Sequence, residues 1–242
     1  MKKQFHTARG EEFLECEKLW IFLFLISVGG FLGAYTFNLK GGVFCNAQTA
    51  NFVMMAIEIG KMNWNRALYF LIPISAYLLG SILSEFFPKH VNKLEILRWE
   101  TFLIVFEMIF ILILGFVPDN APPQICQVAI NFIASMQYNT FRQAEKVPMA
   151  TTFCTNHLRQ IGIYIVKHLR QKDADSKERL IMHLLMLIAF VIGGIISTLL
   201  CVRFNCKAIW FAEIPLLVVF IDLLRADLVS EKDKFDIAPH GH

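Results

Sequence analysis

Long apolar runs alternate with short polar connections along almost the whole of this chain. A helix needs about twenty mostly apolar residues to cross a lipid bilayer, and several runs are close to that length. The pattern therefore predicts an all-α fold: a polytopic transmembrane helical bundle with six full spans. These spans are residues 19–38, 67–84, 96–117, 124–141, 180–202 and 208–224.

Two further segments, 44–59 and 148–166, have the length of helices but carry many amides and hydroxyls. Irregular or broken helices are tolerated within a membrane where they are buried in protein or line a cavity. We therefore interpret both segments as polar re-entrant or broken helices, and Gly41 and Gly42 suit the turn that leads into the first. The alternative is that both segments cross fully, which would give eight spans.

The second half of the chain repeats the order of the first. Repeat 1 covers about residues 19–117 and repeat 2 about 121–225, and landmark residues recur in the same order, with a small gap and an insertion near residues 173–176 needed to keep register. The matched pairs are Tyr35 and Tyr138, Asn51 and Asn156, Gly80 and Gly193, and Glu107 and Glu213. We predict an internal duplication within a single transmembrane domain, 19–225.

The distribution of Lys and Arg favours six spans with inverted halves. Basic residues near span ends accumulate on the cytoplasmic side. Six spans place more of the 23 Lys and Arg residues on the side of the N-terminus than eight spans do. The N-terminal segment 1–18 and a charged, mobile tail, 226–242, are then both cytoplasmic.

Composition narrows the class of protein. Hydrophobic residues make up 56% of the chain and the mean hydropathy is +0.51, which is too apolar for an ordinary soluble domain. A net charge of only +3 gives no reason to expect nucleic-acid binding. The chain contains no HExxH, GxSxG, P-loop or GxGxxG motif, and its six cysteines form no CxxC pair. We expect no enzyme activity, no cofactor and no metal.

Polar residues inside the apolar regions are the candidate functional residues. A carboxylate in mid-membrane usually faces the bundle interior, where it pairs, relays protons or coordinates a cation. Amides and hydroxyls can line a solute pathway or simply bond neighbouring helices, and a basic residue can instead reach the headgroups. The predicted pathway residues are Asn46, Gln48, Thr49, Asn51, Glu107, Thr152, Thr155, Asn156, Arg159 and Glu213.

Two motifs resemble those of a known family. The first is Gly41-Gly42-Val43-Phe44 followed by Asn46, Thr49 and Asn51, and the second is Met136-Gln137-Tyr138-Asn139 followed by Thr151-Thr152 and Thr155-Asn156. Over residues 17–225 the chain resembles the YoaK-like family of bacterial integral membrane proteins of unknown function. It departs from that family at Gln48-Thr49-Ala50-Asn51, where Met-Thr-Gly-Asn is usual, and at Thr155-Asn156, where Thr-Gly is usual. The resemblance implies a membrane protein with two related halves, and it implies no activity.

Taken together, these patterns predict a protein of the bacterial inner membrane whose partners are the lipid bilayer and an unknown small solute. The predicted function is a small-solute transporter or channel. The alternative is a non-transporting membrane scaffold or assembly protein, in which the polar residues serve helix packing. A homodimer is compatible with either function.

Overall fold

A computed structural model describes residues 13–46, 48–92, 96–235 and 237–241, and the fold is all-α with one short hairpin of strands. Residues 1–12 of the predicted N-terminal segment, Ala47 of the first polar segment, and Asp236 and His242 of the tail lie outside the described residues. In chain order the elements are η1 (Glu15–Glu17), α1 (Leu19–Leu39), α2 (Gln48–Gly60), α3 (Trp64–Tyr69), α4 (Leu71–Phe86), α5 (Pro88–Asn92), α6 (Trp99–Leu114), α7 (Pro123–Thr140), β1 (Gln143–Ala144), β2 (Val147–Pro148), α8 (Thr155–Gln171), α9 (Ala174–Phe204), η2 (Asn205–Ala212), α10 (Glu213–Arg225) and η3 (Ala226–Ser230).

Three helical stretches of the described residues are long and apolar enough to cross a membrane. They are Leu19–Leu39, Trp64–Phe86 and the continuous stretch Ala174–Ser230, which includes α9 and α10. Large apolar side chains on the outer faces of α4 and α9, such as Leu78, Ile82 and Leu199, are exposed. This surface is compatible with a membrane protein, because lipid favours apolar side chains that water would not.

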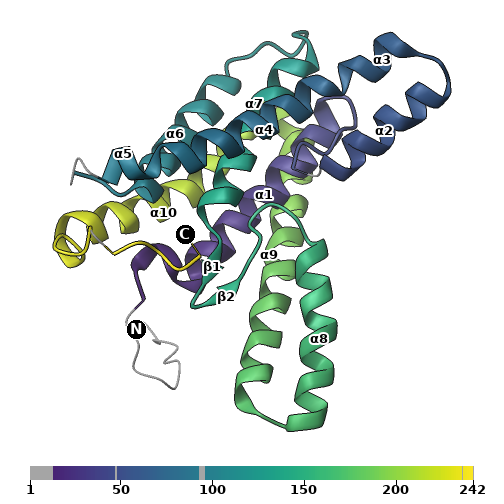
Figure 1. Ribbon diagram of the computed structural model, residues 1–242. Helices are drawn as coiled ribbons and strands as arrows, with labels where there is room; N and C mark the ends of the chain where they lie inside the picture. The colour runs from purple at the N-terminus through teal and green to yellow at the C-terminus, as the bar shows by residue number, and fades with distance from the viewer. Residues whose placement is uncertain (1–12, 47, 93–95, 236, 242) are drawn as a thin grey trace.

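Helix α1 forms the centre of the molecule (Figure 1). It is apolar on all sides, as a buried helix should be, and most of its residues are buried. Helix α9 lies along it in the same direction, and the two backbones approach closely at small residues. A Cβ atom added to Gly30 would lie 2.0 Å from the carbonyl oxygen of Phe190, and one added to Gly193 would lie 1.9 Å from that of Ser27.

The other helices pack in two further pairs, α4 with α7 and α6 with α10. Helix α2 folds back against α3, and α8 folds back against α9, so that two helical hairpins project from the central bundle (Figure 1). Both α2 and α8 are shorter than a full span at 13 and 17 residues. The two polar segments thus form short helices, and in each case the helix that follows brings the chain back to the bundle.

Helices α1 and α7 run in opposite directions along the bundle. Near the beginning of α7, Gln127 Nε2 donates a hydrogen bond to the carbonyl oxygen of Lys40, just past the end of α1 (2.7 Å). Just past the end of α7, Glu145 accepts a hydrogen bond from the backbone N–H of Leu19, the first residue of α1 (3.2 Å). The first helices of the two predicted repeats are therefore antiparallel to each other.

The predicted span 67–84 is two helices, α3 and α4, which meet at Phe70. Pro73 lacks a backbone N–H and its ring crowds the carbonyl four residues earlier, so the helix cannot run regularly through Tyr69. The break between the two helices therefore lies about one turn before Pro73.

The tail differs from the sequence-based expectation of a mobile segment. The backbone N–H of buried Arg98 donates to Asp227 (3.0 Å), and Arg98 Nη1 donates to the carbonyl oxygen of Ile237 (3.0 Å). Glu17, at the other end of the chain, accepts a hydrogen bond from the backbone N–H of His240 (2.8 Å). A buried guanidinium needs such partners, and the tail is ordered because it supplies them.

Candidate functional site

The two polar segments meet on the small-residue face of α1. Asn46 is buried, and its Nδ2 donates hydrogen bonds to the carbonyl oxygens of Gly29 (3.0 Å) and Thr152 (2.7 Å). A Cβ atom added to Gly33 would lie 3.3 Å from the Asn46 amide. Gly29 and Gly33, four residues apart on α1, thus make room for the irregular backbone that precedes α8 and α2.

Two threonine hydroxyls at this junction have no partner. Thr151 and Thr152 are fully or almost fully buried, and neither Oγ1 atom forms a hydrogen bond within the described part of the chain. Leaving a buried hydroxyl unpaired typically costs about 1–3 kcal/mol. Two such groups side by side, next to the Asn46 amide, mark the junction as a place where a polar ligand or water would be stabilised.

A chain of amides extends from the junction to α7. Asn51 donates a hydrogen bond to the side-chain oxygen of Gln48 (3.0 Å), and Gln48 Nε2 donates to Asn131 Oδ1 on α7. Asn131 in turn donates to the carbonyl oxygen of Gln127 (2.7 Å). Gln48 and Asn51 of the first polar segment are therefore connected through partly buried hydrogen bonds to the second half of the molecule.

Helix α7 carries a polar stripe that sequence reasoning missed. Gln127, Asn131, Ser135 and Asn139 are four residues apart, so they share one face of the helix. Gln127 accepts from the Tyr69 hydroxyl (2.5 Å), and Asn139 donates to Ser84 Oγ of α4 (3.0 Å), so this face is turned toward α3 and α4. The sequence feature that indicates this stripe is the regular spacing of amides and hydroxyls within an otherwise apolar run.

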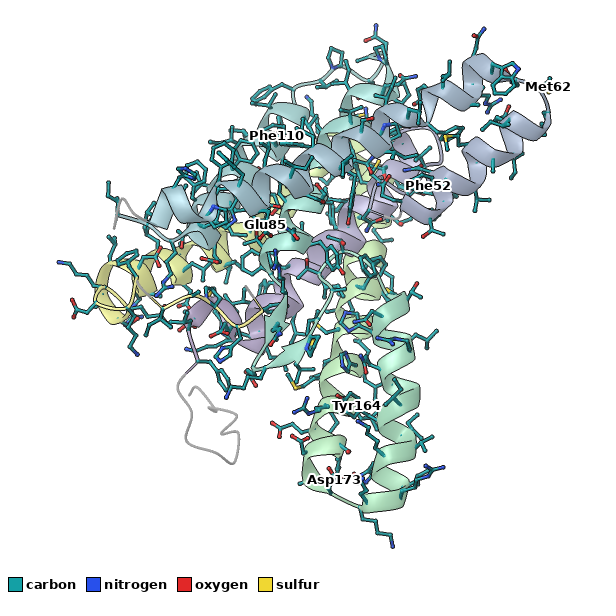
Figure 2. All side chains as sticks on the ribbon, in the orientation of Figure 1. Phe52, Met62, Glu85, Phe110, Tyr164 and Asp173 are labelled. Carbon is teal, nitrogen blue, oxygen red and sulfur yellow. The ribbon has the colours of Figure 1, made fainter. Side chains whose placement is uncertain are left out.

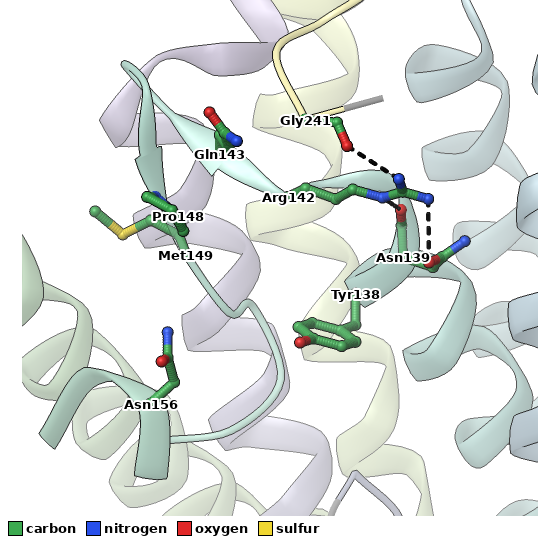
Figure 3. A pocket seen from close by; sticks show the side chains of 8 residues that line it. All are labelled: Tyr138, Asn139, Arg142, Gln143, Pro148, Met149, Asn156 and Gly241. Atoms are coloured by element: carbon green, nitrogen blue, oxygen red, sulfur yellow. Dashed lines mark hydrogen bonds between the residues drawn. The ribbon is translucent and has the colours of Figure 1, made fainter. Parts of the chain in front are cut away.

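The stripe ends at a pocket of about 400 Å³ beside the β1–β2 hairpin (Figure 3). Arg142 lies in this pocket, where its Nε donates to the carbonyl oxygen of Asn139 (2.6 Å) and its Nη1 to that of Gly241 (3.0 Å). Arg142 also forms an ion pair with Glu85. Asn156, one of the predicted pathway residues, lines the same pocket from the start of α8. The guanidinium is thus neutralised and the pocket is polar on one wall.

Glu107 and Glu213 lie elsewhere. Glu107 is buried on α6 and accepts hydrogen bonds from Gln137 Nε2 (3.1 and 3.3 Å). Gln137 does not share the face of α7 that carries the stripe. Glu213 is close enough to Glu107 for their charges to interact, and its Oε1 is buried without a partner among the described residues. The two carboxyls form a second polar group between α6, α7 and α10.

The structure does not bring all predicted pathway residues together. Thr49, Thr155 and Arg159 are exposed on the outer faces of α2 and α8, and Arg159 contacts only its neighbour Asn156 (3.2 Å) among the described side chains. The helical period explains their exposure, because each residue lies more than a quarter turn away from the buried face of its helix. Their pathway role remains a sequence-based prediction.

The fold and the polar junction define a helical protein with membrane-length apolar helices and two polar segments that meet in its interior. The family model described as "Protein of unknown function (DUF1275)" matches residues 21–221, and the chain belongs to this family. The family resemblance predicted from the two motifs is thereby confirmed. No curated protein and no solved structure gives a significant match.

Proposed function

We propose that this is an integral membrane protein that moves a small polar solute across the bilayer, as a transporter or a channel. The observation that carries the proposal is the junction of the two polar segments, where Asn46 joins Thr152 and two buried hydroxyls are left unpaired. The solute would take the hydrogen bonds that these hydroxyls lack. The antiparallel course of α1 and α7 supports two inverted repeats that meet at this junction.

The proposed route follows the polar stripe of α7 from the junction to the pocket at Arg142. It is closed in this structure, because Gly80 of α4 packs against Ser135 so tightly that an added Cβ would lie 2.0 Å from Ser135 Oγ. The route offers amides and hydroxyls, and its one guanidinium is already paired with Glu85. This chemistry favours an uncharged solute that both donates and accepts hydrogen bonds.

The test is solute flux in proteoliposomes, measured by light scattering as vesicles reswell in urea, glycerol or formamide. Asn131 connects the amide chain to the stripe, so Asn131→Leu removes hydrogen bonds worth about 1 kcal/mol each and should lower flux roughly tenfold. The matched control is Asn38→Leu. Among the described residues the Asn38 amide donates its one side-chain hydrogen bond to the exposed Thr198 hydroxyl (3.2 Å), so flux should be unchanged.

Three outcomes would contradict the proposal. They are native flux no higher than that of empty vesicles for every solute, equal flux in the two Asn→Leu variants, and loss of folded protein as the only effect of Asn131→Leu. Each would favour a membrane scaffold in which the polar residues serve helix packing. Glu107→Gln in the same assay shows whether flux also depends on the carboxyl group that Gln137 contacts.

A further inference from the structure

A buried lysine near the end of α1 has sulfur atoms where a counter-ion is expected. Lys40 is only 2% exposed, and its Nζ lies 2.9 Å from the Sγ of Cys206 at the start of η2. The Cys126 thiol of α7 is also close enough to Lys40 to interact with it. Among the described residues, Lys40 forms no ion pair with a carboxylate.

An ammonium group removed from water is costly unless an anion balances it. The thiolate of Cys206 is the nearest group that can supply the negative charge, and a neighbouring Lys stabilises a thiolate. Both partners are held in place by bonds to their backbones. The Tyr35 hydroxyl donates to the carbonyl oxygen of Cys206 (3.1 Å), and Gln127 donates to that of Lys40 (2.7 Å).

Cys206 is buried but lines an open pocket of about 340 Å³. Trp210 and Lys207 of η2 form one wall, and the loop 115–119 after α6 forms the other. This pocket is distinct from the one at Arg142, and it lies at the end of the molecule where α1 and α6 terminate. A small molecule can therefore reach the sulfur without passing through the proposed solute route.

We propose that Cys206 is a reactive-thiol site, paired with Lys40, that is modified by small uncharged peroxides entering from this pocket. The sulfur attacks one peroxide oxygen, so that an S–O bond forms and the O–O bond breaks. The sulfur is oxidised to a sulfenic acid, because the attacked oxygen keeps its hydrogen, and the leaving hydroxide or alkoxide takes a proton from solvent to give water or an alcohol. The thiolate form is required because it is the nucleophile, and Lys40 is the positioning residue that favours it.

The reactivity is tested by brief alkylation of the purified full-length protein with iodoacetamide at about pH 7, followed by mass spectrometry of each cysteine peptide. Cys206 should react faster than Cys154 although it is more deeply buried, because the neighbouring ammonium group of Lys40 favours the nucleophilic form of the sulfur. Cys154 is the internal control, since it is more exposed and its sulfur forms no hydrogen bond with a basic side chain among the described residues.

Substitutions of Lys40 identify the cause of this reactivity. Lys40→Met should lower the Cys206 rate about tenfold near pH 6.5, whereas Lys40→Arg keeps the charge and should keep most of the rate. Exposure to hydrogen peroxide followed by dimedone, which traps sulfenates, should label Cys206 in the native protein. A Cys206 rate no higher than that of Cys154, an unchanged rate in folded Lys40→Met, or no dimedone adduct would each overturn the proposal. The native rates of Cys206 and Cys154 and the rate in Lys40→Arg decide the matter if Lys40→Met does not fold.

Discussion

At the scale of single residues, glycines set how closely the helices approach, and Gly193 gives a sharp prediction. An alanine Cβ there would meet the Ser27 carbonyl oxygen at 1.9 Å, and neither backbone can move without separating α9 from α1. Gly193→Ala should therefore destabilise the protein by about 1–3 kcal/mol, the usual cost of overpacking a core. The change in stability is measured by thermal unfolding in detergent, monitored as the loss of the monodisperse peak in size-exclusion chromatography.

The next residue is the matched control. A Cβ atom added to Gly194 would have its nearest contacts at 3.6 Å, to the Gly30 carbonyl oxygen, and at 3.8 Å, to the Ala34 side chain, which are ordinary packing distances. Gly194→Ala should then be neutral or stabilising by up to about 1 kcal/mol, because alanine favours helix over glycine. Equal unfolding temperatures for the two variants would show that the close approach of α1 and α9 does not limit stability.

At the scale of helices, apolar patterning located most elements within a few residues. The spans predicted at 124–141 and 208–224 correspond to α7 and α10, and the span at 180–202 lies within α9. The start of α9 at Ala174 was missed because its first turn is charged and Asp173 caps it, whereas the prediction relied on hydropathy alone. The β1–β2 hairpin was also missed, since Glu145 and Lys146 adopt positive φ angles that neither residue type signals.

The candidate site was less predictable than the helices. Segments 44–59 and 148–166 were identified from their polar residues, but the bond between Asn46 and Thr152 joins parts of the chain that no local pattern relates. Burial of Lys40 against Cys206 has the same origin, because each residue lies at the end of a different helix. Residue type and spacing indicate which groups are polar, whereas tertiary packing decides which of them meet.

The cap of α9 gives a prediction at this scale that depends on pH. The Asp173 carboxylate accepts a hydrogen bond from the backbone N–H of Ser176 (2.9 Å), and this bond lowers the pKa of Asp173 below its usual value of 3.8. A lowered pKa means that the cap is fully effective above 3.8 and is lost as the pH falls through the lower folded value. Below that range the first turn of α9 should fray.

Amide hydrogen exchange across residues 174–178 measures this fraying. Asp173→Ala removes the cap, so exchange should be faster than in the native protein at neutral pH. Asp173→Asn keeps an acceptor oxygen that does not titrate, so protection should be retained at low pH, when both proteins are compared under the same conditions. If all three proteins exchange alike, the hydrogen bond to Ser176 does not stabilise the helix start.

At the scale of the whole molecule, two close helix contacts join the first half of the chain to the second. Gly193 of α9 packs on Ser27 of α1, and Gly80 of α4 packs on the carbonyl oxygen of Phe132 in α7. In the proposed duplication Gly80 corresponds to Gly193 and α1 to α7. The third helix of each proposed half then packs against the first helix of the other half. Because α1 and α7 are antiparallel, this exchange is the arrangement expected of inverted repeats.

Inverted repeats place the two hairpin turns on opposite sides of the membrane. Met62 in the α2–α3 turn and Asp173 in the α8–α9 turn lie at opposite ends of the molecule in Figure 2. With inverted repeats and six spans, the α2–α3 turn faces outward and the α8–α9 turn faces the cytoplasm. Eight full spans with parallel halves would place both turns in the cytoplasm. The sidedness of two residues therefore separates the topologies.

The measurement uses Lys61→Cys and Lys172→Cys, two exposed positions in these turns, in a protein whose native cysteines are replaced by alanine or serine. A membrane-impermeant maleimide should label Lys61→Cys in sealed cells or right-side-out vesicles, and Lys172→Cys only after the membrane is opened. Labelling of both positions only after opening would favour eight spans, and the two polar segments could not then be half-helices from opposite faces. The solute route along α7 depends on this geometry, because alternating access needs an opening on each side of the junction.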